Sequence, residues 1–145
     1  MGRNFSPQSA ARALARRLAV QALYRWQLNA GPWQDLVNEF ASERDMARAD
    51  GEYFRMLVQS AVEQHEALDA ALTPLLSRSA AHLDPVEHAV LLIAALELRT
   101  QAQIPFRVII NEAVSLTRRF GATDGHKFIN GVLDRAARDW RPSER

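Results

Sequence analysis

One uninterrupted apolar run constrains the fold of this chain more than any other feature of its sequence. The run extends from Ala89 to Leu96, and a helix-start signal precedes it, in which Asp84 can cap the helix and Pro85 suits the first helical position. A helix that is apolar on every side must be surrounded. The predicted helix, residues 84–98, spans roughly 22 Å, whereas a bilayer span needs about 20 apolar residues. We therefore predict the central core helix of a soluble domain.

Apolar residues at helical spacing predict amphipathic helices on both sides of this core helix. The predicted ranges are 10–29, 33–42, 50–72, 106–120 and 125–140. No run alternates with a period of two residues, and no hairpin signal appears. The predicted fold class is therefore all-α: a compact bundle of six to seven helices in two small helical subdomains.

Local signals predict where several of these helices end. Gly121 suits the left-handed position after a helix end, and Asp124 can cap the last helix. Gly131 costs that helix about 1 kcal/mol relative to alanine, so we predict a tight helix crossing there.

Thr73-Pro74 ends the 50–72 helix. It divides a single domain, 1–145, into an N-terminal part of about 10–72 and a C-terminal part of about 75–140 that share one core. Residues 1–8 are polar and expected to fray.

Composition narrows the possible classes of function. The chain has 145 residues and no cysteine, so it can form neither a disulfide nor a thiolate metal site. The four histidines show no metal-binding spacing, and there is no glycine-rich phosphate loop or nucleophile elbow. Neither a signal peptide nor a membrane span is apparent. These observations predict a cytoplasmic protein without metal or cofactor, and they argue against an enzyme.

The charge is unevenly distributed along the chain. Residues 1–30 hold five arginines and no acid, residues 31–90 hold eleven acids and four bases, and residues 91–145 hold nine bases and six acids. This pattern suits an anionic ligand near the two ends and a basic partner in the middle. An alternative remains open, because seventeen of the eighteen basic residues are arginine, which is also what a coding bias produces.

Two groups of residues could bind nucleic acid. The first is the start of the first helix, where arginine forks suited to phosphates precede an aromatic ring that could stack on an unpaired base; its members are Arg12, Arg16, Arg17 and Tyr24. The second is the start of the last helix, where free backbone N–H groups and a lysine would favour a phosphate; its members are Asp124, His126, Lys127 and Phe128. In each group the alternative is a solvated cation beside a packing aromatic.

These same stretches carry a resemblance to a known family. The matching residues include Ala19-Val20-Gln21-Ala22-Leu23-Tyr24, Ile110-Asn111-Glu112-Ala113, Phe120-Gly121-Ala122, His126-Lys127-Phe128 and Asn130-Gly131-Val132-Leu133-Asp134. Together with shorter matches elsewhere, they cover nearly the whole chain in order. The sequence closely resembles the NusB family of transcription antitermination factors.

The resemblance implies an all-helical protein that binds without catalysis. Family members bind the single-stranded boxA element of nascent ribosomal RNA together with the ribosomal protein NusE, in an elongation complex with RNA polymerase and other Nus factors. By this resemblance Arg12 and Arg16 belong to an RNA-contacting start, Tyr24, Lys127 and Phe128 touch RNA, and Asp124 lies beside that surface. Glu87, expected at the exposed start of the central helix, falls where NusE binds.

Two alternatives stay open at this stage. Ala13 and Leu14 interrupt the dense arginine run that family members often carry, so the chain could be a NusE-binding adaptor with little direct RNA affinity. The sequence also leaves open whether the chain is a monomer or a homodimer that hides its RNA surface.

Overall fold

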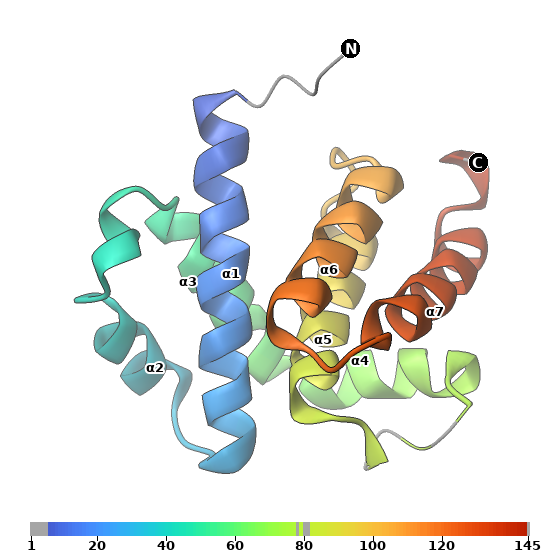
Figure 1. The fold of residues 1–145 in the computed structure, drawn as a ribbon, viewed down its shortest axis with the longest axis horizontal. Helices are drawn as coiled ribbons and strands as arrows, with labels where there is room; N and C mark the ends of the chain where they lie inside the picture. Colours follow the sequence, from blue (N-terminus) through green and yellow to red (C-terminus); the bar gives the residue numbers. More distant parts are fainter. Residues whose placement is uncertain (1–5, 78, 80–81, 145) are drawn as a thin grey trace.

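The fold consists of helices packed around one buried helix (Figure 1). The computed structural model describes residues 6–77, 79 and 82–144, so most of the predicted frayed start lies outside the described residues. In those ranges there is no strand, and the all-α prediction is confirmed. The helices are α1 (Pro7–Leu28), α2 (Trp33–Phe40), α3 (Gly51–Glu63), α4 (His65–Leu72), α5 (Pro85–Thr100), α6 (Phe106–Phe120) and α7 (Gly125–Trp140), with 3-10 turns at Arg44–Ala47, Thr73–Leu75 and Pro142–Glu144.

The central helix α5 begins as its sequence predicts. The Asp84 carboxylate accepts hydrogen bonds from the backbone N–H groups of Val86 and Glu87, at 3.1 and 3.2 Å, and Pro85 occupies the first turn. Every residue from Ala89 to Leu98 is buried, since α1, α3, α4, α6 and α7 all contact this helix. None of the described helices combines the length and apolar content needed to span a membrane.

The predicted long helix 50–72 is in fact two helices. It breaks at Gln64, whose φ of −110° and ψ of 12° end α3, and α4 then turns to pack on α5. At the break the His65 ring meets Trp26 of α1 edge-on, with 4.9 Å between ring centroids, and Leu68 and Leu72 become buried. The local sequence contains neither glycine nor proline, so tertiary packing imposes this break.

The predictions for Gly121 and Gly131 are wrong. Gly121 has φ −91° and ψ 179°, and a side chain is excluded there because a Cβ would lie 2.7 Å from the Thr117 carbonyl oxygen. Asp124 instead takes the left-handed conformation, with φ 69°, and it precedes α7 without a side-chain capping bond. A Cβ on Gly131 would meet only the tip of Arg135, at 3.8 Å, so no tight helix crossing explains this glycine.

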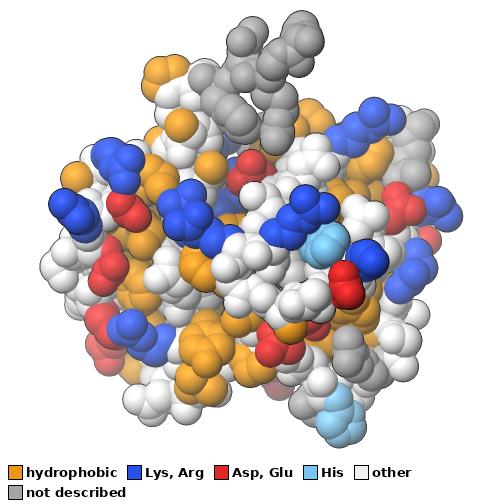
Figure 2. Space-filling model, in the orientation of Figure 1, with side chains coloured by type: hydrophobic (Ala, Val, Ile, Leu, Met, Phe, Trp, Pro, Cys, Tyr) orange, Lys and Arg blue, Asp and Glu red, His pale blue; other side chains and the backbone are white. Residues whose placement is uncertain are grey.

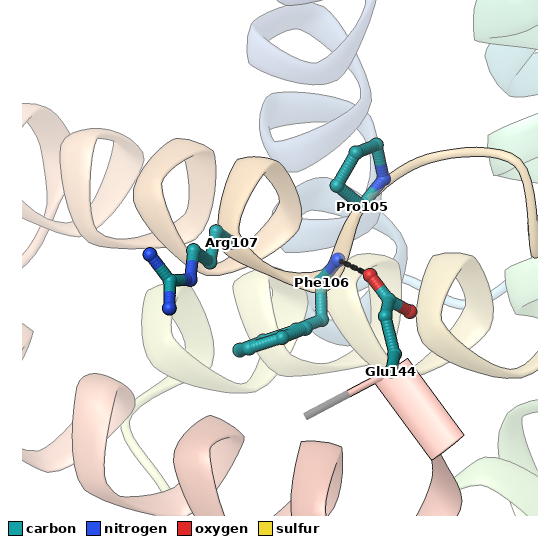
Figure 3. A pocket seen from close by; sticks show the side chains of 4 residues that line it. All are labelled: Pro105, Phe106, Arg107 and Glu144. Carbon is teal, nitrogen blue, oxygen red and sulfur yellow. Dashed lines mark hydrogen bonds between the residues drawn. The ribbon is translucent and has the colours of Figure 1, made fainter. Parts of the chain in front are cut away.

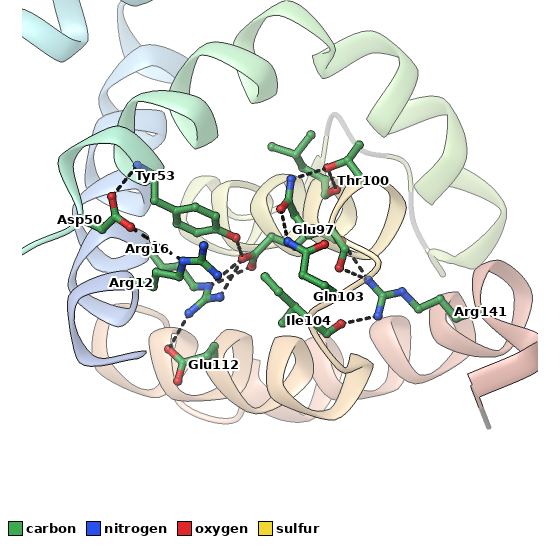
Figure 4. Close-up of polar contacts among 12 residues, drawn as sticks. Arg12, Arg16, Asp50, Tyr53, Glu97, Thr100, Gln103, Ile104, Glu112 and Arg141 are labelled. Carbon is green, nitrogen blue, oxygen red and sulfur yellow. Dashed lines mark hydrogen bonds and ion pairs between the residues drawn. The ribbon is translucent and has the colours of Figure 1, made fainter. Parts of the chain in front are cut away.

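The C-terminal turn is hydrogen-bonded to the connection between α5 and α6. Arg141 is buried and donates to the carbonyl oxygens of Leu98 at 2.9 Å and Gln101 at 2.8 Å (Figure 4). Glu144 accepts from Arg141 with one oxygen and from the backbone N–H of Phe106 with the other, at 2.9 and 2.7 Å, beside an open hollow at the start of α6 (Figure 3). The Phe106 N–H first, and then Arg141, lower the pKa of the Glu144 carboxyl.

Candidate nucleic-acid interface

Arg16, predicted to contact RNA, lies in the core. Its side chain is 5% exposed, and its Nε donates to both carboxylate oxygens of Glu97 on α5, at 3.0 and 2.9 Å. Glu112 of α6 lies 3.8 Å from the same guanidinium, and the Tyr53 hydroxyl of α3 also donates to Glu97 (Figure 4). Burial lowers the pKa of Arg16, but the neighbouring Glu97 carboxylate outweighs it and the pKa is raised overall. Arg16 therefore joins four helices as a charged core residue.

The other two predicted arginines of α1 differ in whether their charge is paired. Arg12 stacks over the Tyr53 ring, with its Cζ 4.7 Å from the centroid, and its Nε lies 3.8 Å from an Asp50 carboxylate oxygen. Arg17 is half-buried and forms no ion pair with another described residue. Of the three, Arg17 is thus the one whose charge is not already matched within the described chain.

Tyr24 borders a groove between α1 and the ends of two other helices. It is 39% exposed, and Leu28, one turn further on, is 63% exposed. Val86 at the start of α5 and Phe120 at the end of α6 form the opposite wall, and the hollow has a volume of about 440 Å³. Because its walls are largely apolar, the groove suits an aromatic or aliphatic group of a partner.

The start of α7 presents a paired lysine. Lys127 and Asp124 are both well exposed, and the Lys127 Nζ lies 3.5 Å from a carboxylate oxygen of Asp124. His126 is half-buried at this helix start. Phe128 is half-buried too, but it packs against the hydrophobic core. The predicted group is therefore assembled, with Lys127 and Asp124 toward solvent.

Glu87 is not at an exposed helix start, so that prediction is wrong. Its residue exposure is 6%, and its Oε2 lies so close to Gly125 that a Cβ there would approach within 2.6 Å. The carboxylate consequently packs against the first residue of α7. Its neighbour Val86 lines the groove instead.

The two predicted groups lie close to each other on the molecule. Phe120, which lines the groove together with Tyr24, is followed directly by the connection that carries Asp124 and leads to Lys127 in the first turn of α7. Figure 2 shows Lys, Arg and His side chains across the middle of the face formed by α1, α6 and the start of α7, with hydrophobic side chains below them over α1. Sequence reasoning missed the groove itself, because its wall combines residues from three helices.

This fold and this face define a class: a small all-helical protein whose surface combines cations with an apolar groove. Within the described ranges, no three His, Cys, Asp or Glu side chains are placed to hold a metal ion. The model of the NusB family matches residues 13–138, and the chain belongs to this family. The resemblance seen in the sequence is thereby confirmed.

Relatives of known name and structure agree with this assignment. The transcription antitermination protein NusB of Idiomarina loihiensis is 46% identical over 134 residues, which cover 92% of this chain and 96% of that protein. NusB of Xanthomonas axonopodis pv. citri is 46% identical over 92% of this chain and 84% of its own. The structure of T. maritima NusB superposes with a TM-score of 0.78 at 29% identity, covering 91% of this chain and 94% of that one. A crystal structure of antitermination factors NusB and NusE with dsRNA gives 0.83 at 28% identity, covering 90% and 98%.

Proposed function

We propose that this chain is a non-enzymatic transcription antitermination factor. It binds the boxA element of nascent ribosomal RNA together with the ribosomal protein NusE, and the complex promotes processive transcription of ribosomal RNA operons by RNA polymerase and other Nus factors. The place of action is the cytoplasm. The whole chain serves as a single RNA-binding domain, in which the helices up to about residue 72 and those from about residue 75 share the core.

Family membership and one structural relationship support this function. The relationship is the adjacency of the groove at Tyr24 to the start of α7 that bears Lys127, because a ring for stacking and a cation for phosphate then lie along one path. Related antitermination factors have been crystallised as a NusB–NusE complex with dsRNA. We therefore propose that a strand of RNA runs across this face.

The structure changes the roles that we propose for individual residues. Arg17, Tyr24, His126 and Lys127 are the proposed RNA contacts, with Asp124 orienting Lys127 through their ion pair. Arg16 receives a structural role, because its guanidinium is buried against Glu97. Arg12 holds α1 to α3 through Asp50, and Phe128 anchors the start of α7 in the core.

We propose that NusE binds at the Leu28 end of the apolar groove and at the adjoining start of α5, next to the Tyr24 ring that stacks on RNA. Leu28, which is 63% exposed, and Val86 form the apolar surface at this end. In this proposal Glu87 does not contact NusE directly. Its carboxylate packs against the start of α7 and supports the residues beside the groove.

A fluorescence titration at two salt concentrations tests this function. The probes are single-stranded boxA RNA, the same bases in scrambled order, and a boxA duplex, each with and without NusE. We expect preference for single-stranded boxA and a log–log salt slope of about −0.7 for each phosphate neutralised. Equal, salt-independent affinity for all three RNAs, with NusE binding retained, would favour the alternative of an adaptor that contacts RNA little.

A matched pair of variants separates local contact from general charge. Lys127→Gln removes the exposed lysine of the α7 start, whereas Arg55→Gln removes an exposed arginine of α3 that stacks on Trp33. The first change should flatten the salt slope by about 0.7, and the second should leave it unchanged. An identical slope for both variants would count against the assigned face.

A further inference from the structure

Two of the cations predicted to contact RNA are already paired within the protein. Arg16 is buried against Glu97 and Arg12 is paired with Asp50, whereas Lys127 is well exposed and its pair with Asp124 is screened by solvent. An RNA backbone carries a full negative charge on each phosphate, and its binding depends on cations that are not already matched. Among the described residues of the two predicted groups, Arg17 is the arginine or lysine without an ion pair. Among the described cations of the two groups, Arg17 and Lys127 therefore remain for phosphates, and an RNA strand on this face would gain from further positive charge.

Two exposed arginines at the end of α6 provide that charge. Arg118 and Arg119, called here the α6 arginine pair, occupy the last turn of α6. Arg118 forms no hydrogen bond, ion pair or ring contact with another described residue, and it continues an exposed stripe at helical spacing through Val108, Asn111 and Ser115. Arg119 stacks its guanidinium on Phe120, with its Cζ 5.6 Å from the ring centroid.

The position of the pair lies between the two predicted groups. Phe120, adjacent to the pair, forms the wall of the groove that faces Tyr24. The connection after Phe120 leads within a few residues to Lys127. Figure 2 shows basic side chains over this part of α6, between those over α1 and those at the start of α7. A strand that extends from Tyr24 to Lys127 therefore passes the end of α6.

We propose that the α6 arginine pair binds the phosphates of the RNA strand midway between Tyr24 and Lys127. This inference rests on the proposed RNA-binding function. Each guanidinium presents several N–H donors in a planar fork that suits a phosphate. The stacking of Arg119 on Phe120 orders that side chain before the RNA arrives, so less conformational entropy is lost on binding.

A purely structural role for the pair makes a different prediction. Cations in the last turn stabilise a helix through its dipole, and this effect needs no ligand. Arg138 is the control, because it too is an exposed arginine in the last turn of a helix, α7, where it is paired with Asp134 at 3.1 Å. If the α6 arginine pair were structural, changes at either site would affect helix stability and neither would change RNA binding.

The experiment compares boxA RNA binding by wild type, Arg118→Gln/Arg119→Gln, Arg138→Gln and the charge-preserving Arg118→Lys/Arg119→Lys over a range of salt concentrations. For the glutamine double variant we expect a salt slope flatter by about 1.4 and affinity about 25-fold lower at 0.1 M salt, from two lost phosphate contacts. The Arg138 variant should match wild type, and the lysine variant should restore the slope. Circular dichroism melting verifies that each variant is folded.

The outcomes distinguish this inference from the proposed function. If wild type binds boxA with a salt-dependent affinity and the glutamine double variant has the same slope, the α6 arginine pair does not bind phosphate and the inference is overturned alone. If wild type shows no RNA binding with or without NusE, both are overturned. An equal loss in the Arg138 variant would also overturn the inference, because general charge would then explain the effect.

Discussion

Arg16 of α1 and Glu97 of α5 form a bidentate ion pair inside the core, although they are 81 positions apart in the chain. The pair joins the first helix to the central one, and the Tyr53 hydroxyl and Glu112 add α3 and α6 to the same cluster. A charge cluster of this kind contributes less through its own attraction than through the cost of breaking it, because a lone buried charge has lost its water.

Replacing Arg16 by methionine should therefore be strongly destabilising. Removing one partner of a buried pair typically costs about 3–5 kcal/mol, since the remaining carboxylate is left uncompensated. Urea unfolding measures this loss. Arg17→Met is the control, with an expected change within about 0.5 kcal/mol. The double variant Arg16→Met/Glu97→Met should recover part of the loss, and a single-variant loss no larger than that of the control would contradict a buried role.

The Tyr53 hydroxyl should ionise at unusually high pH. Burial first, and then the Glu97 carboxylate, raise its pKa far above the ordinary value of 10. In a Tyr24→Phe background, Tyr53 is the one tyrosine left, and absorbance at 295 nm should show a midpoint well above 10. The pKa is raised in the folded state, so the stabilisation is complete below pH 10 and is lost as pH rises toward the folded value. A midpoint near 10 would contradict the geometry.

Loss of the same hydroxyl should weaken the fold. Tyr53→Phe removes a donor to a charged acceptor in the core, for which a cost of about 1.5–3 kcal/mol is typical. Urea unfolding at pH 7 measures it. The Tyr24→Phe variant, at an exposed ring, is the matched control and should unfold like wild type.

The Phe106 amide should report the titration of Glu144. The amide N–H donates to the Glu144 carboxylate, and this bond is the first cause of the lowered pKa. In an NMR pH titration the Phe106 amide shift should therefore change with a midpoint below the ordinary carboxyl value of 4.5. Since the folded pKa is lowered, the contact stabilises above the unfolded value and is lost as pH falls through the folded one. Glu144→Gln should abolish the titration, and a persistent midpoint there would assign it elsewhere.

Truncating Leu28 at the groove should weaken NusE binding and leave stability unchanged. Leu28→Ala removes an exposed apolar side chain, and burial of a leucine side chain contributes about 1.5–3 kcal/mol, which is about tenfold or more in affinity. Isothermal titration calorimetry with NusE measures it. Val108→Ala is the control, because it also truncates an exposed aliphatic side chain but lies outside the groove. Equal affinities of the two variants would place the NusE contact elsewhere.

Local sequence patterns predicted some parts of the site and missed others. The helix start at Asp84-Pro85 was predicted correctly, because a capping residue acts on its near neighbours. Between α6 and α7 the prediction located the two helix ends, but the left-handed residue is Asp124 and not Gly121, and Asp124 makes no side-chain capping bond. The groove was not predicted, since Tyr24, Val86 and Phe120 come from three separate helices. The break at Gln64 was also missed, because it depends on packing between His65 and Trp26 and not on a local helix breaker.

The all-helical class, the buried central helix and the family could all be predicted from the order of residues. Periodicity and an apolar run from Ala89 to Leu96 suffice for this, since burial of apolar surface is non-directional and follows from the pattern alone. Which charged residues face solvent depends on the tertiary structure. Arg16 and Arg17 are neighbours of the same type, and yet one pairs with Glu97 in the core while the other has no ion-pair partner in the described chain. Whether a charged side chain is buried in an ion pair or exposed depends on a partner from another helix. That partner comes near only when the helices pack together.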